Sequence, residues 1–151
     1  MQIIVYDLKD QPIIQLLAEH MQNMQSSSPP ESVHALDIEA LKAPDITFWS
    51  AWENEELLGC AALKEISSTM GEIKSMRTAS AHHRKGVASN LVNTIIETSI
   101  ERGYKQLYLE TVSMVEFAAA RLLYTRFGFT FCPPFSGYEE DQNSLFMMRQ
   151  L

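Results

Sequence analysis

Basic residues are scarce in this chain of 151 residues. The 12 Lys and Arg residues stand against 19 Asp and Glu residues, which gives a formal net charge of -7 at pH 7. A protein that binds nucleic acid uses many Lys and Arg side chains to neutralise phosphates, and this chain has few of them. The sequence therefore argues against a nucleic-acid-binding protein.

Cysteine is also scarce, because Cys60 and Cys132 are the only two in the chain. They show neither the density of a disulfide scaffold nor the close spacing of a metal site, and we expect buried free thiols. The N-terminus has no basic leader and no apolar run approaches the length of a bilayer span. These absences predict a cytoplasmic protein with no membrane partner.

Hydrophobic residues make up 46% of the sequence, which is enough for one domain over residues 1–151 with a full core. Strand-like segments alternate with segments of helical period. Strands are predicted over residues 3–8, 46–53, 57–66, 71–78, 106–111, 129–131 and 144–150, and helices over residues 10–24, 32–42, 88–100 and 115–127. The two strands that flank the helix over 88–100 form a βαβ unit, which predicts a parallel pair inside an α/β (α+β) fold.

A basic loop leads from the strand over 71–78 into the following helix. Its cations are Lys74, Arg77, Arg84 and Lys85, and no acidic residue lies between Glu72 and Glu97. Unpaired backbone N–H groups and the positive end of the helix dipole meet at a helix start. The loop is neither a P-loop nor a dinucleotide fingerprint, because G-x-x-x-x-G-K-[ST] and G-x-G-x-x-G are both missing. The pattern predicts a site for a phosphate-bearing anion.

Two motifs resemble a known family. The loop reads Arg84-Lys85-Gly86-Val87-Ala88, and the later helix reads Leu123-Tyr124-x-x-Phe127-Gly128-Phe129. Together they resemble the signatures of the GNAT superfamily of acetyl-CoA-dependent N-acetyltransferases. The resemblance implies a mixed, mostly antiparallel sheet with a central splayed parallel strand pair and flanking helices. It also implies direct acetyl transfer from acetyl-CoA to an amine of a small molecule or peptide, without a metal.

The same resemblance assigns the cofactor-binding residues. The pyrophosphate of coenzyme A is expected at the loop and the helix start, and the pantetheine arm along the backbone of the preceding strand. The residues concerned are Met76, Arg77 and Thr78 for the arm, and Arg84, Lys85, Gly86, Val87, Ala88 and Ser89 for the pyrophosphate. His83 and Phe117 depart from the family pattern, which leaves an acetyl-CoA-binding sensor without catalysis as the alternative function.

Three residues are candidates for catalysis. Tyr124 could protonate the departing thiolate, since a phenol has a pKa near 10, although its helical stripe also suits a core tyrosine. An amine acceptor must lose a proton before it can attack, so a base is needed. Glu72 is the candidate, by a spacing to Gly86 that resembles the histone acetyltransferase branch, and a solvated strand-end carboxylate is the alternative interpretation. Glu110 on the neighbouring strand is the other candidate base.

The remaining features carry weaker predictions. His82 and His83 have no partnered Cys or acidic ligand, so no metal is expected there. Trp49 and Trp52 are predicted to pack in the core. The long connection over residues 132–143 is either a solvated loop or part of the acceptor pocket, with Phe135 and Tyr138 as walls and the acids Glu139, Glu140 and Asp141 attracting a cationic amine. Apolar surface could support a homodimer, whose face the sequence does not identify.

Overall fold

The computed structural model describes residues 2–5, 43–54, 56–78, 86–112, 118–142 and 144–151. The helices predicted over residues 10–24 and 32–42 lie outside these ranges, as do the end of the first predicted strand and the start of the helix predicted from residue 115. In the described ranges, no helix is long and apolar enough to cross a membrane.

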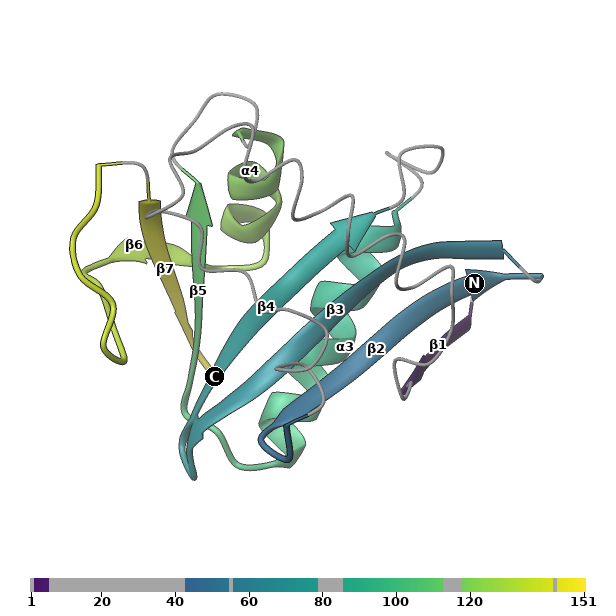
Figure 1. The fold of residues 1–151 in the computed structure, drawn as a ribbon, viewed down its shortest axis with the longest axis horizontal. Coiled ribbons are helices and arrows are strands. Elements are labelled where there is room, and N and C mark those ends of the chain that lie inside the picture. Colours follow the sequence, from purple (N-terminus) through teal and green to yellow (C-terminus); the bar gives the residue numbers. More distant parts are fainter. Residues whose placement is uncertain (1, 6–42, 55, 79–85, 113–117, 143) are drawn as a thin grey trace.

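Seven strands form one sheet in the order β1-β2-β3-β4-β5-β7-β6, with two helices described beside it (Figure 1). Every pair of neighbouring strands is antiparallel except β4 and β5, which are parallel. The elements are β1 (Gln2–Val5), β2 (Ile46–Glu53), β3 (Glu56–Ser67), β4 (Met70–Thr78), α3 (Val87–Glu101), β5 (Gln106–Val112), α4 (Ala118–Arg126), β6 (Thr130–Cys132) and β7 (Ser144–Gln150). The predicted fold class and its parallel βαβ unit are confirmed.

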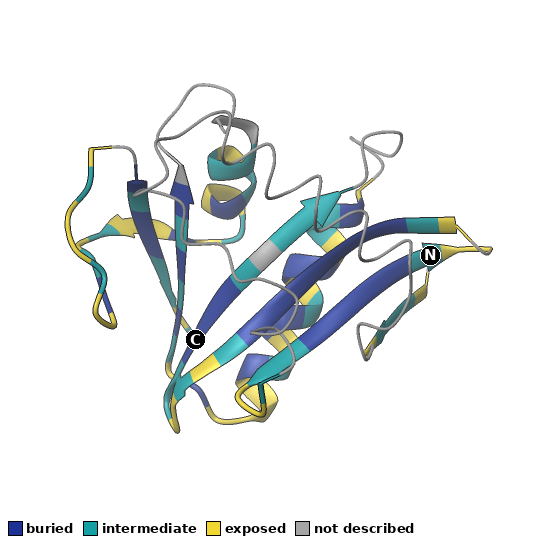
Figure 2. Ribbon diagram, in the orientation of Figure 1, coloured by how far each residue is buried: buried dark blue, intermediate teal, exposed yellow. Residues whose placement is uncertain are grey.

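The core lies between the sheet and α3. The helix buries the stripe Leu91, Val92 and Ile95, which are 0% exposed, against the central strands. Figure 2 shows the buried residues running along β2, β3 and β4 and along one side of α3. A stripe with a period near 3.6 therefore meets strands that are hydrophobic on the facing side, which is how a helix packs on a sheet.

The predicted core residues differ in how deeply they are buried. Trp49 is buried, whereas Trp52 is half-buried and its Nε1 donates a hydrogen bond to Ser50 Oγ at 2.7 Å. Cys60 is a buried free thiol, as predicted. Cys132 is also a free thiol but is only half-buried, because the three-residue strand β6 lies at the edge of the sheet. The prediction of burial is therefore wrong for Cys132.

Candidate functional site

The parallel strands β4 and β5 separate part of the way along their length. Their ladder runs from Met70 and Gln106 to Ile73 and Leu109, and within the described chain no ladder pair joins them beyond that point. From there β4 continues against β3 as far as Thr78, while β5 continues against β7 as far as Val112. The predicted splayed pair is thus present, with the two strands apart beyond Ile73 and Leu109.

The start of α3 lies next to the far end of β4. A Cβ atom on Gly59 of β3 would be 2.6 Å from the carbonyl oxygen of Arg77 and 2.9 Å from Cγ1 of Val87. Only glycine fits at this position, so the last residues of β4 and the first turn of α3 meet around it. The segments 76–78 and 86–89, predicted separately to bind the cofactor, are therefore neighbours in the fold.

Gly86 precedes α3 in the left-handed conformation, with φ 78° and ψ 9°. Its carbonyl oxygen accepts a hydrogen bond from Asn90 Nδ2 at 2.8 Å, and no acidic residue occupies the first turn. The first N–H groups of an α-helix have no partner within the helix and lie at its positive end. The described residues thus fit a bound phosphate group. Arg84 and Lys85 lie outside them, as do His82 and His83.

Glu72 lies where β4 begins to leave β5, because it belongs to the last but one pair of their ladder. Its side chain is only 3% exposed. The carboxylate oxygen Oε2 is 3.1 Å from Lys74 Nζ and accepts a hydrogen bond from the Tyr138 hydroxyl at 2.8 Å. Lys74 Nζ in turn donates to the Tyr138 oxygen at 2.7 Å. Each of these three groups contacts the other two, and we call them the Glu72 triad. The alternative interpretation of Glu72 as a solvated carboxylate at a strand end is therefore wrong.

Glu110 follows the last ladder pair on β5 and is half-buried. It is paired across the sheet with Phe146 of β7. Burial raises the pKa of Tyr138 above its ordinary value, and the negative charge of Glu72, the hydrogen bond to Glu72 and the negative charge of Glu110 raise it further. The charges of both candidate bases therefore raise the pKa of the same phenol, so Glu72 and Glu110 lie in one region of the structure.

Tyr124 lies on α4 and is 6% exposed. Its ring meets that of Phe129 edge to face, with centroids 5.8 Å apart, and it belongs to the core cluster that includes Val87 and Leu109. Burial raises the pKa of its phenol, which keeps the hydroxyl protonated at neutral pH. A protonated phenol is the form that an acid catalyst needs, and the same burial equally suits a core tyrosine.

The segment after β6 folds back over this part of the sheet. Phe135 packs against Tyr108 at 4.7 Å and Phe146 at 5.8 Å between ring centroids, and Tyr138 packs against Phe135 at 5.2 Å and Phe146 at 5.5 Å. This aromatic cluster places the Tyr138 hydroxyl on Glu72. At Phe135 and Tyr138 the segment therefore packs on the sheet, and these two side chains are not those of a solvated loop.

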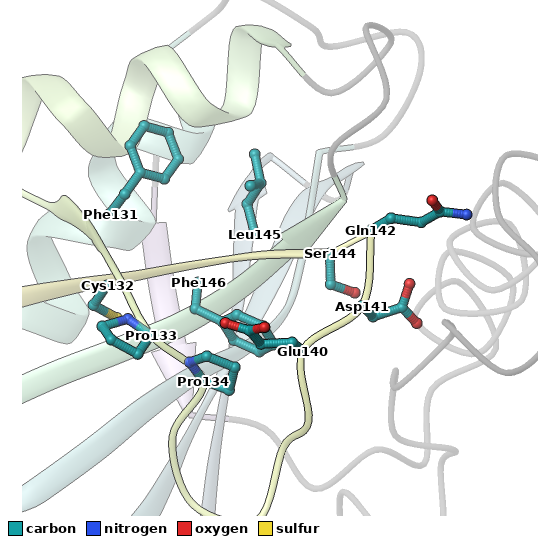
Figure 3. Close-up of a pocket in the computed structure, with 10 residues that line it drawn as sticks. All are labelled: Phe131, Cys132, Pro133, Pro134, Glu140, Asp141, Gln142, Ser144, Leu145 and Phe146. Carbon is teal, nitrogen blue, oxygen red and sulfur yellow. The ribbon is translucent and has the colours of Figure 1, made fainter.

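A pocket of about 490 Å³ lies between the end of β6, the start of β7 and the connection that joins them (Figure 3). Its lining consists of Phe131, Cys132, Pro133, Pro134, Glu140, Asp141, Gln142, Ser144, Leu145 and Phe146. Two of the three acids predicted to attract an amine, Glu140 and Asp141, line it (Figure 3). Phe135 and Tyr138, which the sequence predicted as walls of the acceptor pocket, do not line this one.

Sequence reasoning missed the Glu72 triad. Lys74 follows Glu72 by two residues on a strand, which places both side chains on one face, and that signal was available. Tyr138 is 66 residues away from Glu72, and no local pattern predicts such a contact. In the described ranges no group of three or more His, Cys, Asp and Glu residues could hold a metal ion.

Comparison with known proteins gives consistent matches. The acetyltransferase (GNAT) family model matches residues 13–129. The chain is 53% identical to the uncharacterized N-acetyltransferase YsnE of Bacillus subtilis strain 168, over 100% of both sequences. Among solved structures, an acetyltransferase of the GNAT family from Staphylococcus aureus Mu50 has a TM-score of 0.75 at 21% identity, with 99% of this chain and 98% of that one covered.

A second similar structure contains a bound ligand. It is a GNAT family acetyltransferase from Elizabethkingia anophelis with acetyl-CoA bound, which has a TM-score of 0.69 at 17% identity and covers 99% of this chain and 97% of that one. At such low identity the structural likeness supports the fold. The family model and the Bacillus subtilis relative carry the assignment further, and the chain belongs to the acetyltransferase (GNAT) family of N-acetyltransferases.

Proposed function

We propose that the protein transfers the acetyl group of acetyl-CoA directly to an amine of a small molecule or peptide. The observation that carries this proposal is the separation of β4 from β5 after Ile73 and Leu109, with the start of α3 beside the far end of β4. On this proposal the ligand runs along β4 beyond Ile73 and ends at the positive start of α3. A long ligand with a polar, pantetheine-like arm and a pyrophosphate matches these two features.

The two features also give the ligand a direction. If the pyrophosphate binds the N–H groups of residues 86–89, the arm runs along Met76–Thr78 from the far end of β4 toward the point where the strands meet. The thioester then lies near that point, where Glu72 and Glu110 are found. Arg84 and Lys85 would add positive charge beside the pyrophosphate.

The chemistry needs one base and one acid. The amine nitrogen bonds to the thioester carbonyl carbon, and the carbon–sulfur bond then breaks. Glu72 or Glu110 takes the proton that the amine loses, directly or through a water molecule, and Tyr124 gives a proton to the departing thiolate. Backbone N–H groups near Met76 and Arg77 polarise the carbonyl oxygen. No covalent intermediate on the enzyme is required.

Two measurements test the proposal. Calorimetry with acetyl-CoA measures binding, and release of free thiol from acetyl-CoA measures transfer to a panel of a small alkylamine, an amino acid, a polyamine, an aminoglycoside and a lysine-containing peptide. We expect binding and acetylation of at least one amine. Binding without turnover on a broad panel would support an acetyl-CoA sensor, and absence of binding would contradict the cofactor site itself.

The base is identified by two matched substitutions, Glu72→Gln and Glu110→Gln. Both keep the shape of the side chain and remove its charge. Loss of a positioned base usually lowers the rate about 10²–10⁴-fold, so we expect a fall of that size in kcat for one variant. Circular dichroism must show a folded protein for each variant, since Glu72→Gln leaves the buried Lys74 without its carboxylate. Wild-type kcat in both folded variants would contradict the base role of either residue.

A further inference from the structure

The connection after β6 contributes one side chain to the middle of the sheet. Tyr138 is half-buried, and its ring is held by Phe135 and Phe146. Its hydroxyl then reaches a pair of opposite charges on β4 that is nearly removed from solvent, with exposures of 9% for Lys74 and 3% for Glu72. The Tyr138 ring alone accounts for the packing against Phe135 and Phe146. The contacts of its hydroxyl with Glu72 and Lys74 need a separate explanation.

The hydroxyl completes the Glu72 triad in a definite way. It donates to Glu72 Oε2 at 2.8 Å and accepts from Lys74 Nζ at 2.7 Å, while Lys74 Nζ is itself 3.1 Å from the same Oε2. Two contacts that meet on one carboxylate oxygen restrict rotation of the carboxylate and so fix the direction of its other oxygen.

We propose that Tyr138 is a positioning residue for acetyl transfer, which orients Glu72 through its hydroxyl. This inference rests on the proposed function, in which Glu72 lies near the thioester. It also gives the connection after β6 a role in the reaction, because residues 133–142 must be folded over the sheet for Tyr138 to reach Glu72.

Other charged groups face the same carboxylate. Lys64 is the cross-strand partner of Glu72 on β3, Lys74 is on β4 itself, and Glu110 on β5 acts on the same phenol. A change in activity can therefore be assigned to the Tyr138 hydroxyl only if these three residues stay unchanged. A substitution that removes the single hydroxyl oxygen meets this condition.

The test uses Tyr138→Phe, with Tyr104→Phe as its matched control. The control removes a similar hydrogen bond, from the Tyr104 hydroxyl to Glu65 Oε1 at 2.6 Å. Glu65 pairs with Gly71, next to Glu72, and the Tyr104 ring lies on the side of Gly71, so this bond is on the other face of the sheet from Glu72. The activity measurement uses the amine of the panel above that is acetylated fastest. We expect Tyr138→Phe to lower kcat/KM for that amine about 10- to 100-fold, since a hydrogen bond to a charged group is lost.

The split between kcat and KM separates positioning from stability. In Tyr138→Phe the loss should lie in kcat, because the carboxylate loses a contact that orients it. The KM for acetyl-CoA should stay at the wild-type value, and Tyr104→Phe should keep the wild-type kcat and KM. An unchanged kcat and an unchanged kcat/KM in Tyr138→Phe would overturn the proposal.

A second measurement needs no acceptor. Amide hydrogen exchange over residues 134–142 should become faster in Tyr138→Phe and stay unchanged in Tyr104→Phe. If no amine is acetylated, the proposed function fails. The exchange measurement then still tests whether the contact between Tyr138 and Glu72 holds this segment in place. Faster exchange confined to this segment would support the link, and wild-type exchange in Tyr138→Phe would overturn it.

Discussion

Replacing Gly86 by alanine tests the phosphate site at the start of α3. Gly86 has φ 78°, and the nearest described atom to an added Cβ is Asn90 Nδ2 at 3.9 Å, so the substitution is strained in conformation but not crowded by those residues. Gly103, just after α3, has φ 83° with no described atom within 4 Å. It is a matched control, because an alanine there suffers the same strain at the other end of the same helix.

The expected stability change is the same for both variants. An L-residue in the left-handed region costs roughly 1–2 kcal/mol, and the reduced freedom of the unfolded chain offsets about 0.4–1 kcal/mol of that. The net loss in the free energy of unfolding is therefore about 1 kcal/mol, or roughly 2–4 °C in Tm for a chain of this size. Thermal unfolding of Gly86→Ala and Gly103→Ala measures it.

The two variants should differ in ligand binding. A methyl group and a displaced backbone at residue 86 would interfere with the N–H groups that we propose bind the pyrophosphate, and each such hydrogen bond lost costs about 1.5–3 kcal/mol. Calorimetry well below Tm should therefore show acetyl-CoA affinity reduced about tenfold or more in Gly86→Ala and unchanged in Gly103→Ala. Equal affinity in the two variants would refute the assignment of the pyrophosphate to this helix end.

Two further predictions concern buried groups. Tyr124→Phe should lower kcat about 10²–10⁴-fold and leave acetyl-CoA affinity intact, as measured by steady-state kinetics and calorimetry; wild-type kcat where chemistry limits the rate would exclude the acid role. Burial raises the pKa of the Cys60 thiol from 9.0 to about 12, against a smaller opposing effect of Arg77. The folded state then holds its proton more tightly than the unfolded state. Stability from this group is complete below pH 9 and is lost as pH rises toward 12, by up to about 1.4 kcal/mol per pH unit. Urea unfolding between pH 8 and 10.5 should show a shallower loss in Cys60→Ala than in wild type, and identical slopes would contradict this cause.

The sequence predicted the elements whose pattern is local. The hairpin of β2 and β3, helix α3 and strand β7 follow from periodicity and from turn residues, and β7 agrees with its predicted bounds. The parallel order of β4 and β5 follows from the connection through α3, because such crossovers join parallel strands. Local pattern and short connections therefore determine most of the described sheet.

The site was only partly predictable. Gly86 is identified by its place between a strand and a helix, and its left-handed φ agrees with the need for glycine. The contact between Tyr138 and Glu72 depends on how the connection after β6 folds over the sheet, and it joins residues 66 positions apart. The pocket between β6, β7 and their connection likewise depends on the path of that connection. Tertiary packing, which periodicity does not encode, decides both.

The most direct test of the central claim is an amide chemical-shift titration of ¹⁵N-labelled protein with acetyl-CoA. The largest shifts should fall at residues 76–78 and 86–89, on the two sides of the junction around Gly59. Shifts confined to the pocket between β6, β7 and their connection, or no shifts at saturating acetyl-CoA, would contradict a coenzyme A site at this junction.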